Sequence, residues 1–202
     1  MMITELKEVS SSRVKVYADE QPAFVLYKGE LRKYGLKEGE ELSPQIYEKL
    51  IGEVLLKRAK LRCMNLLKSR DYTVMQLRQK LKQGFYPEEV IEEALSYVAS
   101  FHYIDDLRYA EDFIHYNCSR KSRRRIENDL LNKGISKETI GEAWVKWEAV
   151  GNVQDEDEQI ETLLSKKHFD ASTADLKELR KMYAFLLRKG FSADKIQKHL
   201  QK

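Results

Sequence analysis

The pattern of hydrophobic positions changes near residue 43. Before it, apolar residues form short runs around Val14 and Phe24, and the segment ADEQPA between them has the composition of a turn, with Pro22 near its end. The segment from Ile3 to Val9 is predicted to form a further strand. The segment from Glu30 to Tyr34 is predicted to form a single helical turn. Residues 1–42 therefore predict a small β-meander. It is too small to bury a core alone, so it must pack on the rest of the chain or be mobile.

From Ser43 onward the apolar residues recur every three to four positions, which indicates helices. Ser43 is a suitable N-cap and Pro44 a suitable first helical residue. The apolar positions from Ile46 to Leu66 predict one long helix or two abutting ones.

Three stretches of the helical region resemble one another: residues 77–94, 127–144 and 183–200. Each has a Leu three residues before a Gly, an apolar residue directly after that Gly, and a β-branched residue six positions after it. The three sets are Leu81, Gly84, Phe85 and Val90; Leu131, Gly134, Ile135 and Ile140; and Leu187, Gly190, Phe191 and Ile196. The glycines are spaced by 50 and 56 residues, which indicates repeats of one supersecondary unit.

The repeated pattern predicts a helix, a tight turn and a second helix. The Gly is expected to end the first helix in the left-handed conformation, and the apolar residue after it to fold back onto that helix. Ser136 and Ser192 then cap the second helix, and Pro87 opens it in the first repeat. A further helix precedes each pair: residues 59–67, 107–118 and 160–167.

The predicted fold is mainly all-α: three tandem three-helix repeats in an elongated curved body, with the small N-terminal β-meander. We expect a β-type extension over residues 1–50, repeat 1 over 51–103, repeat 2 over 104–150 and repeat 3 over 151–202.

Composition limits the classes of function. The chain has 202 residues and a net charge of +3, from 36 basic and 33 acidic side chains, so any signal for nucleic acid must be local. Cys63 and Cys118 sit in apolar helical patterns and are expected to be small buried thiols without a disulfide. The N-terminus lacks the apolar region of a secretory signal, and no window approaches eighteen apolar residues, so we expect a cytoplasmic protein without a membrane span.

The strongest local signal is the segment SRKSRRRIENDLLNKGI, residues 119–135. Its cations Arg120, Lys121, Arg123, Arg124 and Arg125 lie at the start of a short helix, where the helix dipole already disfavours positive charge. An external anion is therefore expected to compensate them, and Arg binds both phosphates and carboxylates. The cluster alone does not separate nucleic acid from an acidic protein surface. A solvated helix end is the third alternative, and we favour a functional contact over it.

Other candidate chemistry is weak. His115 and Cys118 are three residues apart on a helix, but no second Cys or His pair has ligand spacing, so we expect no metal and no cofactor. No phosphate-binding Gly loop or nucleophile elbow is present, which disfavours an enzyme. Asp105 and Asp106 are predicted to shape the start of a helix, one of them as its N-cap, rather than to bind a cation. The acidic run 155–158 is predicted to be a solvated linker and the first turn of a helix. The aromatic residues are assigned to packing rather than to base stacking.

Two segments resemble a known family. HYIDDLRYAEDFI, residues 102–114, followed by RRRIENDLLNKGI, residues 123–135, resembles the central motif of the RecX family, and residues 66–95 resemble its first repeat. The likeness covers about residues 55–202 and leaves out the β-type N-terminus. Ser122 stands where the family more often has Gly.

The resemblance implies a cytosolic, monomeric modulator of the RecA recombinase, acting in DNA repair, homologous recombination and the SOS response. Such a protein binds the RecA filament on single-stranded DNA, and it most often inhibits extension, ATP turnover, strand exchange and co-protease activity. It would have no catalytic residue and no cofactor. The contact candidates are Arg108, Arg120, Lys121, Arg123, Arg124 and Arg125; Asp105, Asp106, Gly84, Gly134 and Gly190 are structural. The alternative is a sequence-independent DNA-binding protein that acts without RecA.

Overall fold

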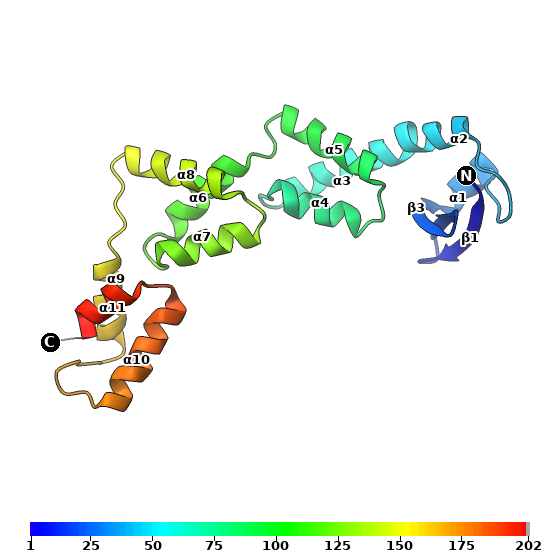
Figure 1. The fold of residues 1–202 in the computed structure, drawn as a ribbon. Coiled ribbons are helices and arrows are strands. Elements are labelled where there is room, and N and C mark those ends of the chain that lie inside the picture. The colour runs from blue at the N-terminus through cyan, green and yellow to red at the C-terminus, as the bar shows by residue number, and fades with distance from the viewer. Residues whose placement is uncertain (201–202) are drawn as a thin grey trace. The chain divides into compact units, whose positions relative to one another are not determined.

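The computed structural model describes residues 1–200 and divides into two compact units, Met1–Asp105 and the chain from Asp106 onward (Figure 1). The first unit begins with an antiparallel sheet in the order β1-β2-β3, formed by Ile3–Glu8, Arg13–Ala18 and Gln21–Tyr27. Helix α1, Lys28–Tyr34, follows directly. The predicted meander and helical turn are confirmed.

The β2–β3 hairpin turn is shorter than the sequence predicts. Ala18 pairs with Gln21, so the loop consists of Asp19 and Glu20, which have φ values of 47° and 64°. Two consecutive residues with positive φ match the right-handed twist of a hairpin. Pro22 therefore belongs to strand β3 rather than to the turn.

The sheet packs on helices of its own unit. Val16, Phe24 and Leu26 are fully buried in one hydrophobic cluster that also contains Leu50 and Leu55 from the helical part. Of the two expectations for the N-terminal segment, packing on the helical body is the correct one for this unit.

Arg58 reinforces the same packing with polar contacts. Its guanidinium donates a hydrogen bond of 3.2 Å to the backbone carbonyl of Val25 in β3 and forms an ion pair with Glu30 in α1. The side chain of Arg58 thus contacts both the last strand and the first helix.

One helical stretch runs from residue 44 to residue 67. It comprises α2, Pro44–Lys49, the π-helical segment η1, Leu50–Leu55, and α3, Leu56–Leu67. Ser43 Oγ accepts a hydrogen bond of 3.3 Å from the backbone N–H of Ile46, which confirms the predicted cap.

The three predicted three-helix repeats are present. The first consists of α3, α4 (Val74–Lys82) and α5 (Glu88–Ser100). The second consists of α6 (Asp106–Asn117), α7 (Arg123–Asn132) and α8 (Lys137–Ala149). The third consists of α9 (Glu156–Lys166), α10 (Leu176–Lys189) and α11 (Ala193–Leu200). The second and third repeats each enclose a hydrophobic cluster of their own, and the first shares its cluster with the sheet.

The turns between the paired helices confirm the repeat but shift its register. In repeats 2 and 3, Gly134 and Gly190 have φ values of 84° and 96°, as predicted. The next residue, Ile135 or Phe191, donates its backbone N–H to the carbonyl five positions earlier, that of Leu130 or Leu186. This 6→1 bond is the Schellman helix ending, and Ile135 and Phe191 are both buried.

Leu130 and Leu186 are therefore the core residues of these helices, and both are fully buried. Leu131 and Leu187, the leucines of the repeat pattern, are the outer members of these pairs, with exposed fractions of 36% and 44%.

In repeat 1 the left-handed residue is Phe85, with φ of 59°, and not Gly84. The N–H of Tyr86 bonds to the carbonyl of Leu81, so Phe85 takes the place of Gly134 and Tyr86 that of Ile135. Phe85 is exposed, which corrects the prediction that it folds back onto the helix. Gly84 is needed for another reason: a Cβ there would lie 2.8 Å from Cε2 of Tyr86.

The two cysteines differ in accessibility. Cys63 is fully buried in α3, and burial raises the pKa of its thiol to about 11, whereas Cys118 is half-buried. At pH 8 a thiol of that pKa is ionised in only about one molecule in a thousand, and the thiolate is the reactive form.

We expect one equivalent of a thiol reagent such as Ellman's reagent to react with the native chain, at Cys118, and a second only on unfolding. Cys118→Ser should abolish the native reaction. Rapid reaction of two equivalents with the native chain would contradict the burial of Cys63.

Candidate partner-binding surface

The basic segment begins where α6 ends. The backbone N–H groups of Arg120 and Lys121 both donate to the carbonyl of Asn117, at 2.9 and 3.0 Å, which turns the chain sharply. Ser122 then caps α7: its φ of −64° and ψ of 156° are extended, and its Oγ accepts the N–H of Arg125 at 3.3 Å. The cations Arg123 to Arg125 consequently form the first turn of α7.

Ser122 also joins repeat 2 to repeat 3. Its hydroxyl is fully buried and donates a hydrogen bond of 3.0 Å to the carbonyl of Lys189, at the end of α10. Gly190 packs against the same point, because a Cβ on it would lie 2.4 Å from Ser122 Oγ. One hydroxyl thus satisfies the start of α7 and the end of α10.

The acidic run 155–158 contributes to this junction. The Glu156 carboxylate accepts the N–H of Arg123, the first residue of α7, at 2.8 Å, and pairs with Lys195 of α11 at 3.0 Å. The Glu156 side chain is only 12% exposed, so describing the run as a solvated linker is wrong for this residue. A carboxylate from repeat 3 therefore compensates the positive end of α7.

The rest of the run binds within repeat 3. Asp155 caps α9 by accepting the N–H of Glu158 at 2.9 Å. The hydrogen bond from His199, together with Lys198, holds the pKa of the Asp157 carboxyl below its ordinary value. These contacts fasten α11 to α9.

Three of the five predicted cations are compensated inside the chain. Lys121 and Arg125 both pair with Asp129, at 2.9 and 3.2 Å. Arg123 pairs with Glu127 and with Glu148, and its guanidinium lies 4.4 Å from the ring centre of Trp144. The expectation that an external anion must balance these three groups is therefore wrong.

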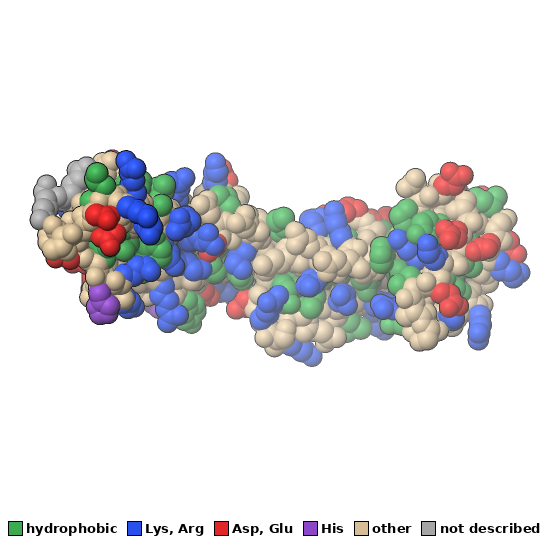
Figure 2. Space-filling view, turned by 90° about the horizontal axis from the view of Figure 1, so that it is seen from below, with side chains coloured by type: hydrophobic (Ala, Val, Ile, Leu, Met, Phe, Trp, Pro, Cys, Tyr) green, Lys and Arg blue, Asp and Glu red, His purple; other side chains and the backbone are tan. Residues whose placement is uncertain are grey.

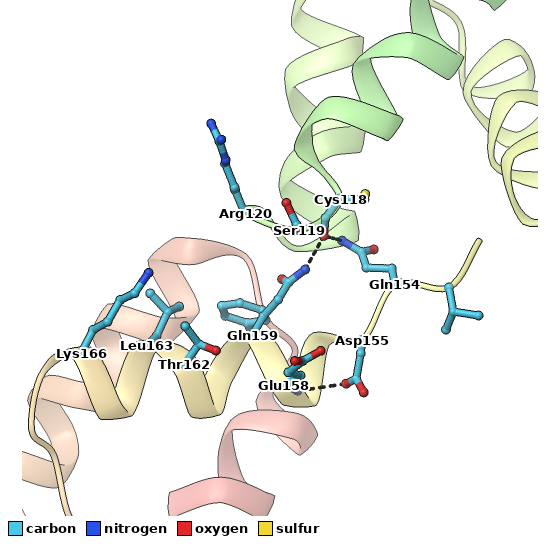
Figure 3. A pocket seen from close by; sticks show the side chains of 12 residues that line it. Cys118, Ser119, Arg120, Gln154, Asp155, Glu158, Gln159, Thr162, Leu163 and Lys166 are labelled. Atoms are coloured by element: carbon cyan, nitrogen blue, oxygen red, sulfur yellow. Dashed lines mark hydrogen bonds between the residues drawn. The ribbon is translucent and has the colours of Figure 1, made fainter.

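Arg120 and Arg124 remain as the charges of the cluster without an internal partner among the described residues. Both are exposed, and neither side chain has a hydrogen bond or ion pair within residues 1–200. In Figure 3, Arg120 extends away from Gln154 and Gln159, the two glutamines that point toward the end of α6.

The remaining candidates lie elsewhere on α6. Arg108 is exposed in its first turn, about three helical turns from the end that leads to Arg120. Helix α6 begins at Asp106, which places Asp105 in the N-cap position. This agrees with the prediction that the two residues shape the start of the helix.

A cavity of about 400 Å³ lies beside the basic segment, between the end of α6 and α9. Gln154 Nε2 donates to the carbonyls of Cys118 and Lys121, at 3.0 and 2.7 Å, and Gln159 Nε2 donates to that of Cys118 (Figure 3). These side chains close the last turn of α6 against repeat 3, so the cavity is part of the junction between repeats.

A group of exposed cations without ion pairs among the described residues lies in repeat 3, where the sequence predicts no site. Figure 2 shows Lys and Arg gathered on its left part, where Figure 1 places residues 154–200. Within residues 1–200, seven exposed cations here take part in no ion pair: Lys166, Lys167, Lys177, Arg180, Lys181, Arg188 and Lys189. The sequence does contain a sign of this basic surface, since α10 carries five basic residues and one acidic residue, Glu178.

Among residues 1–200, no group of three or more His, Cys, Asp and Glu side chains is placed to hold a metal ion. No helix within those residues has the length and apolar character to cross a membrane.

Comparison with known proteins agrees with the repeats. Models of the first, second and third three-helix domains of RecX match residues 59–97, 105–143 and 154–200. The regulatory protein RecX of Caldanaerobacter subterraneus subsp. tengcongensis is 31% identical over 202 residues, which cover 99% of this chain and 98% of the relative.

The chain belongs to the RecX family.

Further RecX proteins are also similar to this chain over most of its length. RecX of Clostridioides difficile is 27% identical over 98% of this chain and 92% of its own. A crystal structure of regulatory protein RecX superposes with a TM-score of 0.61 at 22% identity, covering 99% of this chain and 98% of the other. RecX from Lactobacillus salivarius gives 0.58 at 23% identity, over 73% and 95%. At these identities the solved structures show the fold alone.

Proposed function

We propose that this chain regulates the RecA recombinase by binding its filament on single-stranded DNA and stopping filament extension. The observation that carries the proposal is the match to all three RecX domains, together with a RecX relative aligned over nearly the whole chain. The regulation would act through binding in the cytoplasm and not through catalysis. Blocked extension would lower ATP turnover, strand exchange and co-protease activity.

Within the cluster at residues 120–125, we assign the partner contact to Arg120 and Arg124. They are exposed and unpaired, whereas Lys121, Arg123 and Arg125 are held by Asp129, Glu127 and Glu148. Arg108 is a peripheral candidate in α6. An unpaired guanidinium can form bidentate hydrogen bonds with a carboxylate without first breaking an internal ion pair.

The test is RecA ATP hydrolysis on single-stranded DNA, titrated with this protein well below one molecule per RecA protomer. We expect turnover to fall at these low ratios, because a protein that stops extension acts on filament ends. Unchanged turnover at every ratio would contradict the proposal.

Arg120→Glu with Arg124→Glu should abolish the inhibition without changing the melting temperature. Lys49→Glu with Lys57→Glu is the matched control, since both residues are exposed and each double variant lowers the net charge from +3 by four, to −1. Equal loss of inhibition in both variants would reject the assignment to Arg120 and Arg124.

A further inference from the structure

A groove of about 780 Å³ runs between the end of α9 and helix α10. Its lining includes four cations, Lys166, Lys167, Lys181 and Arg188, and a single carboxylate, Glu178. Glu178 is already engaged at the helix start, where it accepts the N–H of Asp175 at 3.1 Å and completes a capping box. The four cations therefore face the groove without an acidic partner of their own within residues 1–200.

Aromatic surface accompanies these charges. Phe169 and Phe185 line the groove, and Phe185 is half-buried, so one part of its ring stays accessible. The ammonium groups of Lys167 and Lys189 lie 4.6 and 5.6 Å from the centre of the Phe185 ring. Both lysine side chains lie over the ring and are exposed, so their ammonium groups can move from the ring face to neighbouring phosphates while a base stacks on Phe185.

We infer that this groove of repeat 3 binds single-stranded nucleic acid through its backbone, independently of base sequence. The accessible part of the Phe185 ring favours nucleic acid over an acidic polypeptide, because every nucleotide brings a planar base next to its phosphate, whereas an acidic residue brings only its carboxylate. Independence of sequence follows because the groove offers ammonium and guanidinium groups and an aromatic face, which do not distinguish the bases. This site lies on α9, on α10 and on the chain between them, and it needs no RecA. It does not include Arg120 or Arg124, although Lys166 also lines the cavity beside Arg120.

The measurement is fluorescence anisotropy of a labelled oligo-dT strand with the full chain and no RecA, at several salt concentrations. We expect binding at low salt that weakens steeply as salt rises. Lys181→Glu with Arg188→Glu should weaken binding at low salt at least tenfold. It should also flatten the slope of log K against log salt by about 1.4, since each phosphate contact on a single strand contributes roughly 0.7.

The matched control is Lys177→Glu with Arg180→Glu. It changes the charge of the same helix by the same amount, and neither residue lines the groove. We expect the control to keep the wild-type slope. Equal losses in the two double variants would mean that net charge alone attracts DNA, and would overturn the inference.

Phe185→Leu tests the aromatic part while keeping an apolar side chain at a half-buried position. Loss of one stacked base should weaken binding about fivefold or more, with the salt slope unchanged. Unchanged affinity, or tighter binding of poly-glutamate than of oligo-dT with the same dependence on Lys181 and Arg188, would overturn the assignment to nucleic acid. No measurable binding of oligo-dT at low salt would overturn it as well.

The inference and the proposed function fail separately. Inhibition of RecA that survives Lys181→Glu with Arg188→Glu, while oligo-dT binding is lost, leaves the groove assignment standing. Oligo-dT binding without any effect on RecA turnover would contradict only the proposed function.

Discussion

Leu130→Ala is expected to destabilise repeat 2 by about 2–5 kcal/mol, whereas Leu131→Ala should cost only about 1 kcal/mol. Leu130 is fully buried in the cluster with Ile126, Ile135 and Trp144, so truncation leaves a cavity there. Leu131 is 36% exposed, and Leu and Ala have similar helix propensities. The two neighbouring residues form a matched pair on one helix.

The readout for this pair is local to repeat 2. Both tryptophans of the chain, Trp144 and Trp147, are buried in its hydrophobic cluster. Urea unfolding followed by tryptophan fluorescence therefore reports repeat 2 without interference from the other repeats. Equal destabilisation by the two substitutions, or a larger effect of Leu131→Ala, would refute the register of the helix ending.

This register shows what the sequence could and could not predict. Alignment on the glycines detects the repeats and all their helices, because the pattern of turn, cap and apolar face is local. It does not distinguish the two members of the pairs Leu130–Leu131 and Leu186–Leu187, since either leucine of a pair can belong to a wide apolar face of the helix. The choice between them depends on the 6→1 bond from Ile135 or Phe191, which is a property of the folded turn.

Repeat 1 departs from the alignment for a steric reason. Its Gly84 gives space to the ring of Tyr86, and the left-handed conformation passes to Phe85. A glycine needed for close approach and a glycine needed for positive φ look identical in a sequence. The exposed ring of Phe85 lies 3.9 Å from the ammonium of Lys15 in β2, a contact between residues seventy positions apart that local patterns do not reveal.

The internal ion pairs of the basic cluster were not predicted, in part because some of the partners are distant in sequence. The guanidinium of Arg123 pairs with Glu148, 25 positions away, and its backbone N–H donates to Glu156, 33 positions away. A dense cluster such as residues 120–125 draws attention in a sequence, yet most of its charge is used internally. The cations of α10 are spread at helical spacing and pass unnoticed, although none of them has an acidic partner within residues 1–200.

Gly190→Ala is expected to have the second large effect, about 2–5 kcal/mol on repeat 3 and its junction with repeat 2. Two costs add. A residue with a Cβ at φ of 96° costs about 1–2 kcal/mol, and the new methyl group would lie 2.4 Å from Ser122 Oγ, which costs about 1–3 kcal/mol in overpacking. Gly151→Ala separates the two, because Gly151 has φ of 85° and open space around it.

Far-UV circular dichroism during urea unfolding measures both variants, and Ser122→Gly provides the rescue. Glycine is a nearly equivalent N-cap, and it removes the oxygen that meets the new methyl group. The cost of Gly190→Ala should therefore fall in the Ser122→Gly background toward that of Gly151→Ala, leaving a coupling free energy of about 1 kcal/mol or more. Additive effects of the two substitutions would mean that α7 and α10 do not meet at this point. A coupled pair would show that the start of one repeat and the end of the next are fitted to each other through a single hydroxyl and a missing side chain.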